Sequence, residues 1–115
     1  MSITRHHSDA RLSRAVVNNG IVYVAGTTAD NRAVGSKGQT EEILAKIDAL
    51  LKTAGTNKSR LLSAVVYVSD MRVKPGMDEA WMAWIDPKNP PARATVETRL
   101  GSADTLLEIM VTAAQ

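Results

Sequence analysis

The segment 60–69, near the middle of the chain, has the composition of a β-strand in which both faces are largely apolar. In an extended strand, one face would carry Leu62, Ala64, Val66 and Val68, and the other Leu61, Ser63, Val65 and Tyr67. A strand that is apolar on both faces has to be covered on both faces. The fold therefore needs a layer on each side of the sheet that contains this strand.

Two segments have the apolar spacing of amphipathic helices. The first is predicted to begin at Ser36 as its N-cap, with Gln39 three positions later, and to stop at Gly55. Its apolar residues are Ile43, Leu44, Ile47, Leu50, Leu51 and Ala54. The second, shorter helix opens at Pro75 and Gly76, and its apolar residues are Met77, Ala80, Trp81 and Trp84. Because both tryptophans follow this stripe, they are expected to pack into the core.

The remaining apolar runs predict four more strands. Segments 11–17 and 21–26 flank Asn19-Gly20, which is typical of a hairpin turn. Segments 92–98 and 106–113 are predicted to be the last two strands, and a turn near Gly101-Ser102 would pair them antiparallel. The result is an α+β fold, a sheet with two helices on one face. Since two helices cover only one face, we expect self-association into a closed symmetric ring to bury the other.

Composition narrows the functional classes. The 115 residues suffice for a single domain, 1–115, and 14 Lys and Arg among 12 Asp and Glu leave a net charge of only +2, which argues against a nucleic-acid surface. Cysteine is absent, and the two histidines, His6 and His7, lie in an N-terminal segment predicted to be mobile. We therefore expect no metal site, and no glycine-rich loop points to a nucleotide cofactor. Without a signal-like or membrane-spanning apolar run, the protein is expected to be cytoplasmic.

The candidate site lies on the last two strands. Arg93, Thr95 and Glu97 share one face of their strand, and Glu108 lies on the next one. If these strands pair antiparallel, Thr95 comes near Glu108 and Arg93 lies diagonally from it. An arginine fork and a carboxylate could then bind and hydrolyse a small anion. The alternative is a structural ion pair of Arg93 with Glu97 or Glu108, and for Glu108 a buried carboxylate that Arg93 satisfies.

Two motifs carry a resemblance to a known family. Pro90-Pro91-Ala92-Arg93 followed by a strand, and then Leu107-Glu108-Ile109, resemble the signature of the YjgF/RidA family, and the similarity spans nearly the whole chain. It implies a chorismate-mutase-like fold and a homotrimer with its sheets packed inward and ligand clefts between subunits. It further implies hydrolytic deamination of short 2-enamine or 2-imino acids, without a cofactor. In this resemblance Arg93 holds the carboxylate, the backbone near Thr95 orients the imine, and Glu108 activates water.

The chain departs from the family pattern around this site. Leu12 stands where many deaminating members have a ligand-binding tyrosine, although Ser13 keeps the serine that follows. Ala25-Gly26-Thr27 replaces a frequent Ser-Gly-Gln, and Asp78 replaces a frequent asparagine. Trp81 is a further candidate to reach the ligand. A protein that binds or senses a small carboxylate without turnover is therefore the main alternative, and the ribonuclease activity ascribed to some members is disfavoured by the weak basicity.

Overall fold

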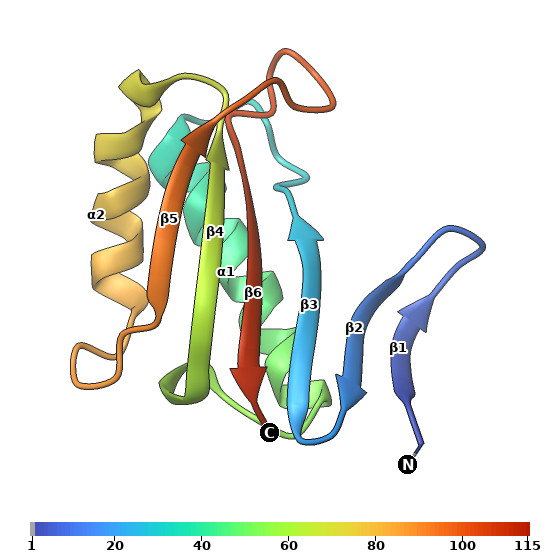
Figure 1. Ribbon diagram of the computed structural model, residues 1–115. Helices are drawn as coiled ribbons and strands as arrows, with labels where there is room; N and C mark the ends of the chain where they lie inside the picture. The colour runs from blue at the N-terminus through green and yellow to red at the C-terminus, as the bar shows by residue number, and fades with distance from the viewer. Residues whose placement is uncertain (1) are drawn as a thin grey trace.

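The computed structural model describes residues 2–115 as one sheet with two helices on one of its faces (Figure 1). The strands are β1 (Thr4–Ser8), β2 (Ser13–Asn18), β3 (Ile21–Thr27), β4 (Leu61–Val68), β5 (Ala92–Glu97) and β6 (Leu107–Ala114). The helices are α1 (Ser36–Thr53) and α2 (Lys74–Trp84), and short 3-10 turns, Lys58–Arg60 and Met71–Val73, precede β4 and α2. The predicted α+β class is confirmed.

Local sequence signals account for the hairpin and for the end of α1. Asn19 and Gly20 both adopt positive φ, 52° and 75°, as the tight β2–β3 turn requires. At the other end of α1, Gly55 has a φ of 83°, and the N–H groups of Gly55 and Thr56 donate to the carbonyls of Lys52 and Leu51. This pair of bonds is a Schellman motif, which glycine favours. The predicted N-cap was wrong by one residue, because Gly35 caps α1 and Ser36 is its first helical residue.

The strand order is β1-β2-β3-β6-β4-β5, which places β4 and β6 in the interior of the sheet. All neighbouring pairs are antiparallel except β4 and β5, which run parallel and are joined through α2. The expected antiparallel pairing of the last two strands is therefore wrong. The physical reason is that β4, apolar on both faces, occupies the position between β5 and β6, where its backbone and side chains are covered best.

The N-terminal segment was also predicted incorrectly. Residues 4–8 are not a mobile tail but the edge strand β1, in which His6 pairs with Ala15 of β2. The side chains of β1 are almost all exposed, so its sequence lacks the buried apolar alternation that marks other strands. Its backbone pairing with β2 holds it in place.

The hydrophobic core lies between the sheet and the helices. Residues of α1 and α2 that pack into it include Ile43, Leu44, Ile47, Leu51, Met77 and Trp81. The facing strand residues include Val22, Val24, Ala64, Val66, Val68, Leu107, Ile109 and Val111. The predicted apolar stripes of both helices therefore face the sheet. No helix within residues 2–115 is long and apolar enough to cross a membrane.

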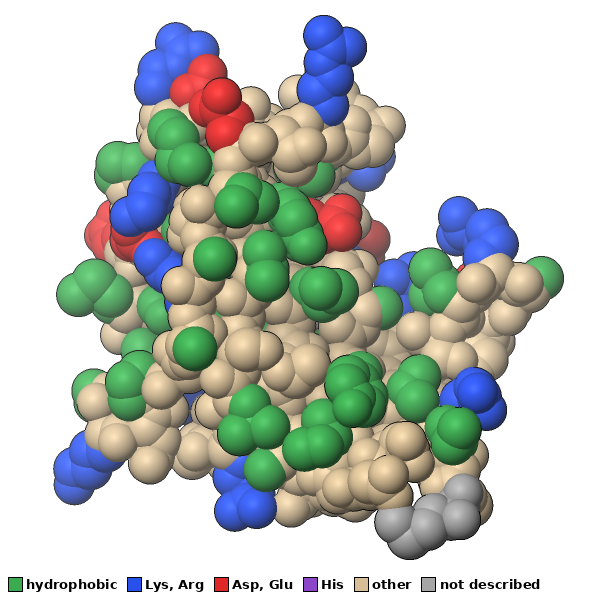
Figure 2. Space-filling model, viewed as in Figure 1, with side chains coloured by type: hydrophobic (Ala, Val, Ile, Leu, Met, Phe, Trp, Pro, Cys, Tyr) green, Lys and Arg blue, Asp and Glu red, His purple; other side chains and the backbone are tan. Residues whose placement is uncertain are grey.

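The opposite face of the sheet carries an apolar surface that no helix covers. We call it the open-face patch; it comprises Tyr23, Val65, Tyr67, Val96 and Met110. Tyr23 is 47% exposed, Met110 41% and Val96 39%. Figure 2 shows apolar side chains gathered over the middle of this face. The second apolar face expected from the sequence is thus present, and in the single chain it lies open.

Candidate functional site

Arg93 lies near the start of the edge strand β5 and points to the helix-covered side. Its Nη2 donates to Asp78 Oδ1 on α2 at 2.8 Å, and the guanidinium carbon lies 5.2 Å from the centre of the Trp81 ring. This is the stacking distance of a cation–π contact. Arg93 thus forms an ion pair, as the sequence-based alternative supposed, but its partner is Asp78 and not Glu97 or Glu108. Glu97 instead accepts a hydrogen bond from the Met71 amide at 2.8 Å.

Asp78 bridges two cations. Its second oxygen accepts a hydrogen bond of 2.6 Å from Lys74 Nζ, one helical turn earlier. Burial of the Asp78 carboxyl opposes its charged form, but the hydrogen bonds from Lys74 and Arg93 and the attraction of both cations outweigh burial and lower its pKa below the usual value. Asp78 is therefore a carboxylate that fixes Arg93 in one orientation.

Arg93 keeps hydrogen-bonding capacity beyond this ion pair. A guanidinium has five N–H donors, and Arg93 donates to Asp78 and makes a long contact of 3.8 Å with Met77 Sδ. Its Nε has no partner among residues 2–115, and 22% of the side chain is exposed. Donors remain free for an incoming carboxylate, so the side chain is both held in place and able to bind.

Glu108 lies on the other face of the sheet, in a hollow of about 340 Å³. The hollow is lined by Gly26, Tyr67, Thr98, Arg99, Leu100, Gly101, Glu108 and Met110. Within the described part of the chain the half-buried Glu108 carboxylate has no hydrogen-bond or ion-pair partner. A carboxylate with free lone pairs beside a cavity can accept a proton from water.

Gly26 makes room for the Glu108 side chain. A Cβ at position 26 would overlap Glu108 Oε2, so a larger residue would displace the carboxylate. Gly26 lies within the irregular stretch of β3 between Val24 and Thr27, where the pairing with β6 shifts register. The sequence offered a signal for this position, because a glycine inside a strand pattern often marks a bulge or a close approach. Tyr67 and Arg99 are further lining residues that sequence reasoning missed.

The structure does not bring Arg93, Thr95 and Glu108 together within one chain. Strand β4 separates β5 from β6, with Ala64 beside Arg93 and Tyr67 beside Glu108. Ala64 is buried on the helix-covered face, whereas Tyr67 belongs to the open face. Thr95 pairs with the buried Val66 and so lies on the face of Arg93. The expected proximity of Thr95 to Glu108 is therefore wrong.

Comparison with known proteins agrees with this fold and these motifs. The sequence model of the family Endoribonuclease L-PSP matches residues 2–115. A RutC family protein from Haemophilus ducreyi is 38% identical over 112 residues, covering 97% of this chain and 96% of that protein. The RutC family protein YoaB from Escherichia coli is 35% identical over 114 residues, covering 99% of each chain.

A solved structure is also similar. NMB1025 of Neisseria meningitidis, a member of the YjgF protein family, has a TM-score of 0.97 at 36% identity, covering 100% of this chain and 96% of that one. The chain belongs to the YjgF/RidA family. Membership confirms the resemblance read from the two motifs around Arg93 and Glu108.

The other candidates from the YjgF/RidA pattern have distinct surroundings. Ser13 Oγ shares a hydrogen bond of 2.7 Å with Ser8 Oγ, so its hydroxyl is engaged at the β1–β2 end. Leu12 is 37% exposed. Trp81 is only 6% exposed and packs in the core, with its ring centre 5.6 Å from that of Trp84. The Trp81 ring therefore packs against the Arg93 guanidinium from the core side, and it does not line the hollow beside Glu108.

Proposed function

We propose that the protein hydrolyses reactive 2-enamine and 2-imino acids to 2-oxo acids and ammonia, in a cleft between two subunits of a homotrimer. The observation that supports this most is the free Glu108 carboxylate, which faces a hollow of about 340 Å³ that Gly26 keeps open. Membership of the YjgF/RidA family supports the reaction class. No cofactor is required, because imine hydrolysis needs only water and proton transfer.

The positions of the two charged groups support the proposed assembly. Arg93 and Glu108 lie on opposite faces of one sheet, so one chain cannot present both to the same small ligand. Arg93 lies on the edge strand β5, where a second copy of the chain can approach it. The open-face patch is an apolar surface of the kind that subunit contact buries. In the proposed trimer, Arg93 of one subunit completes the hollow beside Glu108 of its neighbour.

Each residue of the proposed site has a distinct role in the reaction. Arg93 binds the substrate carboxylate through its free donors, while Asp78 and Trp81 hold the guanidinium. A backbone group near Thr95 orients the imine nitrogen. Glu108 accepts a proton from water as the water oxygen bonds to the C=N carbon, and this proton passes to nitrogen to give a carbinolamine. The carbinol hydroxyl then loses its proton, which Glu108 relays to the same nitrogen, so that nitrogen can leave as ammonia while the oxygen forms C=O. Cleavage of the C–N bond releases ammonia and leaves the 2-oxo acid. One positioned acid–base group contributes roughly 10²–10⁴-fold, which suffices for a reaction that also proceeds unaided.

A second candidate is a protein that binds a small 2-oxo carboxylate without turnover. One observation favours it: Leu12, where the family resemblance places a ligand-binding tyrosine, has no group that could hydrogen-bond the ligand. The endoribonuclease activity in the family's description is disfavoured by the near-neutral charge of +2.

The deciding measurement is ammonia release from 2-aminoacrylate generated in situ by a dehydratase, as a rate above the protein-free background. We expect Glu108→Gln to keep ligand binding and to lose on the order of 10²-fold in turnover, because the amide cannot accept the proton from water. The matched control is Glu41→Gln, an exposed glutamate on α1. A wild-type protein that binds pyruvate but never exceeds the background would leave only the binding function.

Mixed assemblies test the intersubunit site directly. Arg93→Lys and Glu108→Gln subunits are each expected to be inactive as pure trimers, because each lacks one half of every site. When they are unfolded together in equal amounts and reassembled, about one quarter of the clefts would combine an intact Arg93 with an intact Glu108, since each half is intact with a chance of about one half. Recovery of about a quarter of wild-type activity is expected. No recovery would contradict a site shared between subunits.

A further inference from the structure

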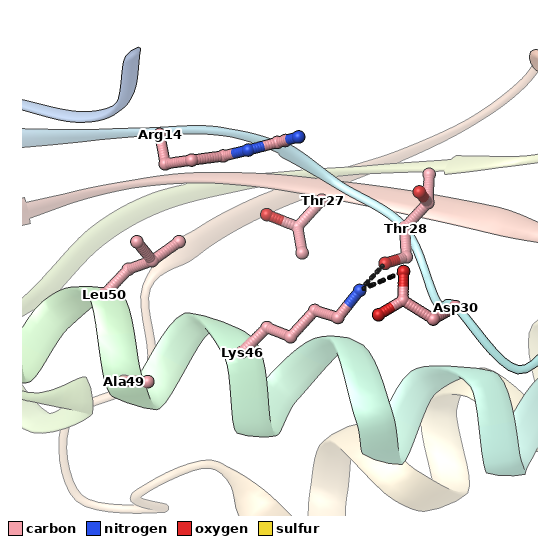
Figure 3. A pocket seen from close by; sticks show the side chains of 7 residues that line it. All are labelled: Arg14, Thr27, Thr28, Asp30, Lys46, Ala49 and Leu50. Carbon is pink, nitrogen blue, oxygen red and sulfur yellow. Dashed lines mark hydrogen bonds and ion pairs between the residues drawn. The ribbon is translucent and has the colours of Figure 1, made fainter. Parts of the chain in front are cut away.

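A second cavity, of about 430 Å³, lies on the helix-covered face between α1 and the ends of β2 and β3 (Figure 3). It is lined by Arg14, Thr27, Thr28, Asp30, Lys46, Ala49 and Leu50. Figure 3 shows Arg14 on the strand side of this space, Lys46 on the helix side, and Thr27 between the two. Its volume falls within the range of about 300–1,000 Å³ that is usual for small-molecule sites.

The cavity arises from the way β2 and β3 separate. Their pairing reaches only as far as Ala15 and Val24, and beyond this point β3 is irregular up to Thr27. The Thr27 hydroxyl donates to the Ala25 carbonyl at 2.9 Å and holds this irregular turn of the strand. On the opposite wall, Ala49 has too small a side chain to fill the gap. The space is therefore bounded by strand backbone and helix that the fold holds in place.

The two cations of the cavity differ in how they are compensated. Lys46 Nζ donates to the Thr28 carbonyl at 2.8 Å and forms ion pairs with Asp30 at 3.1 Å and Glu42 at 3.3 Å. Its charge is therefore balanced by two carboxylates. Arg14 has no carboxylate within ion-pair distance in the described part of the chain. Arg14 is thus the cation of the cavity without an ion-pair partner, although its charge contributes to lowering the pKa of the Asp9 carboxyl.

We propose that this cavity binds a small organic anion, a carboxylate with a short apolar chain, whose charged end is held by Arg14. The guanidinium offers paired donors that match the two oxygens of a carboxylate. The Thr28 hydroxyl, which has no hydrogen-bond partner within residues 2–115, supplies a further donor. Leu50 and Ala49 present the apolar wall against which the chain packs. Lys46 is already paired with Asp30 and Glu42, so its side chain narrows the cavity but does not need to pair with the ligand.

This site is distinct from the hollow beside Glu108. The neighbouring residues Gly26 and Thr27 line different cavities, Gly26 the hollow on the open face and Thr27 the cavity against α1. The β3 backbone therefore separates the two. A ligand that occupies one does not need to leave the other, and the two sites can be assayed independently.

The test is a titration of the ¹⁵N-labelled protein with butanoate, followed by NMR. We expect saturable shift changes at the amides of Thr27 and Thr28 and at Arg14 Nε. Arg14→Gln is expected to weaken this binding at least ten-fold, because the charge-assisted hydrogen bonds are lost. The matched control is Arg11→Gln, an exposed arginine three residues away that does not line the cavity and should leave binding unchanged. Shift changes that centre on Arg93, with none at Thr27 and Thr28, would place butanoate at the proposed catalytic site and would contradict the proposal.

A second variant tests the apolar half of the proposal without touching the charge. Ala49→Leu places a larger side chain in the cavity. Position 49 is exposed on α1 and leucine is a good helix former, so the protein should stay folded. Butanoate binding should weaken at least ten-fold. Inorganic phosphate should bind more weakly than butanoate, because it has no chain to pack against Leu50. The proposal is overturned if no saturable change occurs at Thr27 and Thr28, if Arg14→Gln binds butanoate like the wild type, or if phosphate binds as tightly as butanoate.

Discussion

Replacement of Asp78 by asparagine tests how Arg93 is held. Asparagine keeps the shape of the side chain but removes the charge that faces Arg93 at 2.8 Å and Lys74 at 2.6 Å. The Asp78 side chain is 26% exposed, so the ion pair is stronger than a surface pair and weaker than a fully buried one. We expect the free energy of unfolding to fall by about 1–2 kcal/mol at neutral pH, the range for hydrogen bonds to charged groups after screening by solvent.

The sign of the pH dependence follows from the lowered pKa of Asp78. In the folded protein the hydrogen bonds from Lys74 and Arg93 outweigh the effect of burial and bring this pKa below its usual 3.8. The ionised carboxylate therefore stabilises the fold above pH 3.8, and this stabilisation is lost as the pH falls through the folded-state pKa. The difference in unfolding free energy between wild type and Asp78→Asn should be largest near neutral pH and should shrink in acid.

Urea unfolding of both proteins, at about pH 7 and at about pH 3 and at one protein concentration, measures this difference. The control is Glu79→Gln, whose ion pair with Lys37 is mostly exposed and should be worth less than about 0.5 kcal/mol. Because Asp78 holds the Arg93 guanidinium in one orientation, Asp78→Asn should also bind pyruvate more weakly. Equal stability of wild type and Asp78→Asn at neutral pH, or a difference that does not shrink in acid, would refute the reasoning.

Three further changes test the cavity beside Glu108, the core and the open face. Gly26→Ala should displace the Glu108 carboxylate and reduce ammonia release at least ten-fold, with little change in the urea midpoint; wild-type turnover would contradict the role of Gly26. Ile47→Ala, at a side chain with 0% exposure, should lower the unfolding free energy by about 2–5 kcal/mol in urea titrations, and a loss below about 1 kcal/mol would speak against the packing described. Tyr23→Glu, at a position 47% exposed in the single chain, should leave the chain folded and shift sedimentation from trimer to monomer; an unchanged trimer would place the interface elsewhere.

The elements that could be predicted are those with local signals. The β2–β3 hairpin depends on Asn19 and Gly20, whose positive φ angles only a few residue types adopt easily. The end of α1 depends on Gly55, and the position of α1 on apolar residues at helical spacing. In each case the physical cause lies within a few residues, so the sequence alone is sufficient.

Strand order could not be predicted in the same way, because it depends on contacts between distant segments. The alternation of β5 correctly placed Arg93 and Thr95 on one face. It could not show that β4 would lie between β5 and β6, nor that Glu108 would therefore face the opposite side. The ion pair with Asp78 was missed for the same reason, since α2 reaches Arg93 only because it connects the parallel strands β4 and β5.

The two-sided apolar strand β4 links the fold to the proposed assembly. Its interior position buries Ala64, Val66 and Val68 under the helices and leaves Val65 and Tyr67 on the open face. The same position separates Arg93 from Glu108 by the thickness of the sheet. If one ligand needs both groups, the site has to be divided between subunits. The interior position of β4 then accounts both for this division and for the apolar face that brings the subunits together. Activity and trimer formation should then be lost together on dilution, because a dissociated subunit keeps its fold but only half of each site.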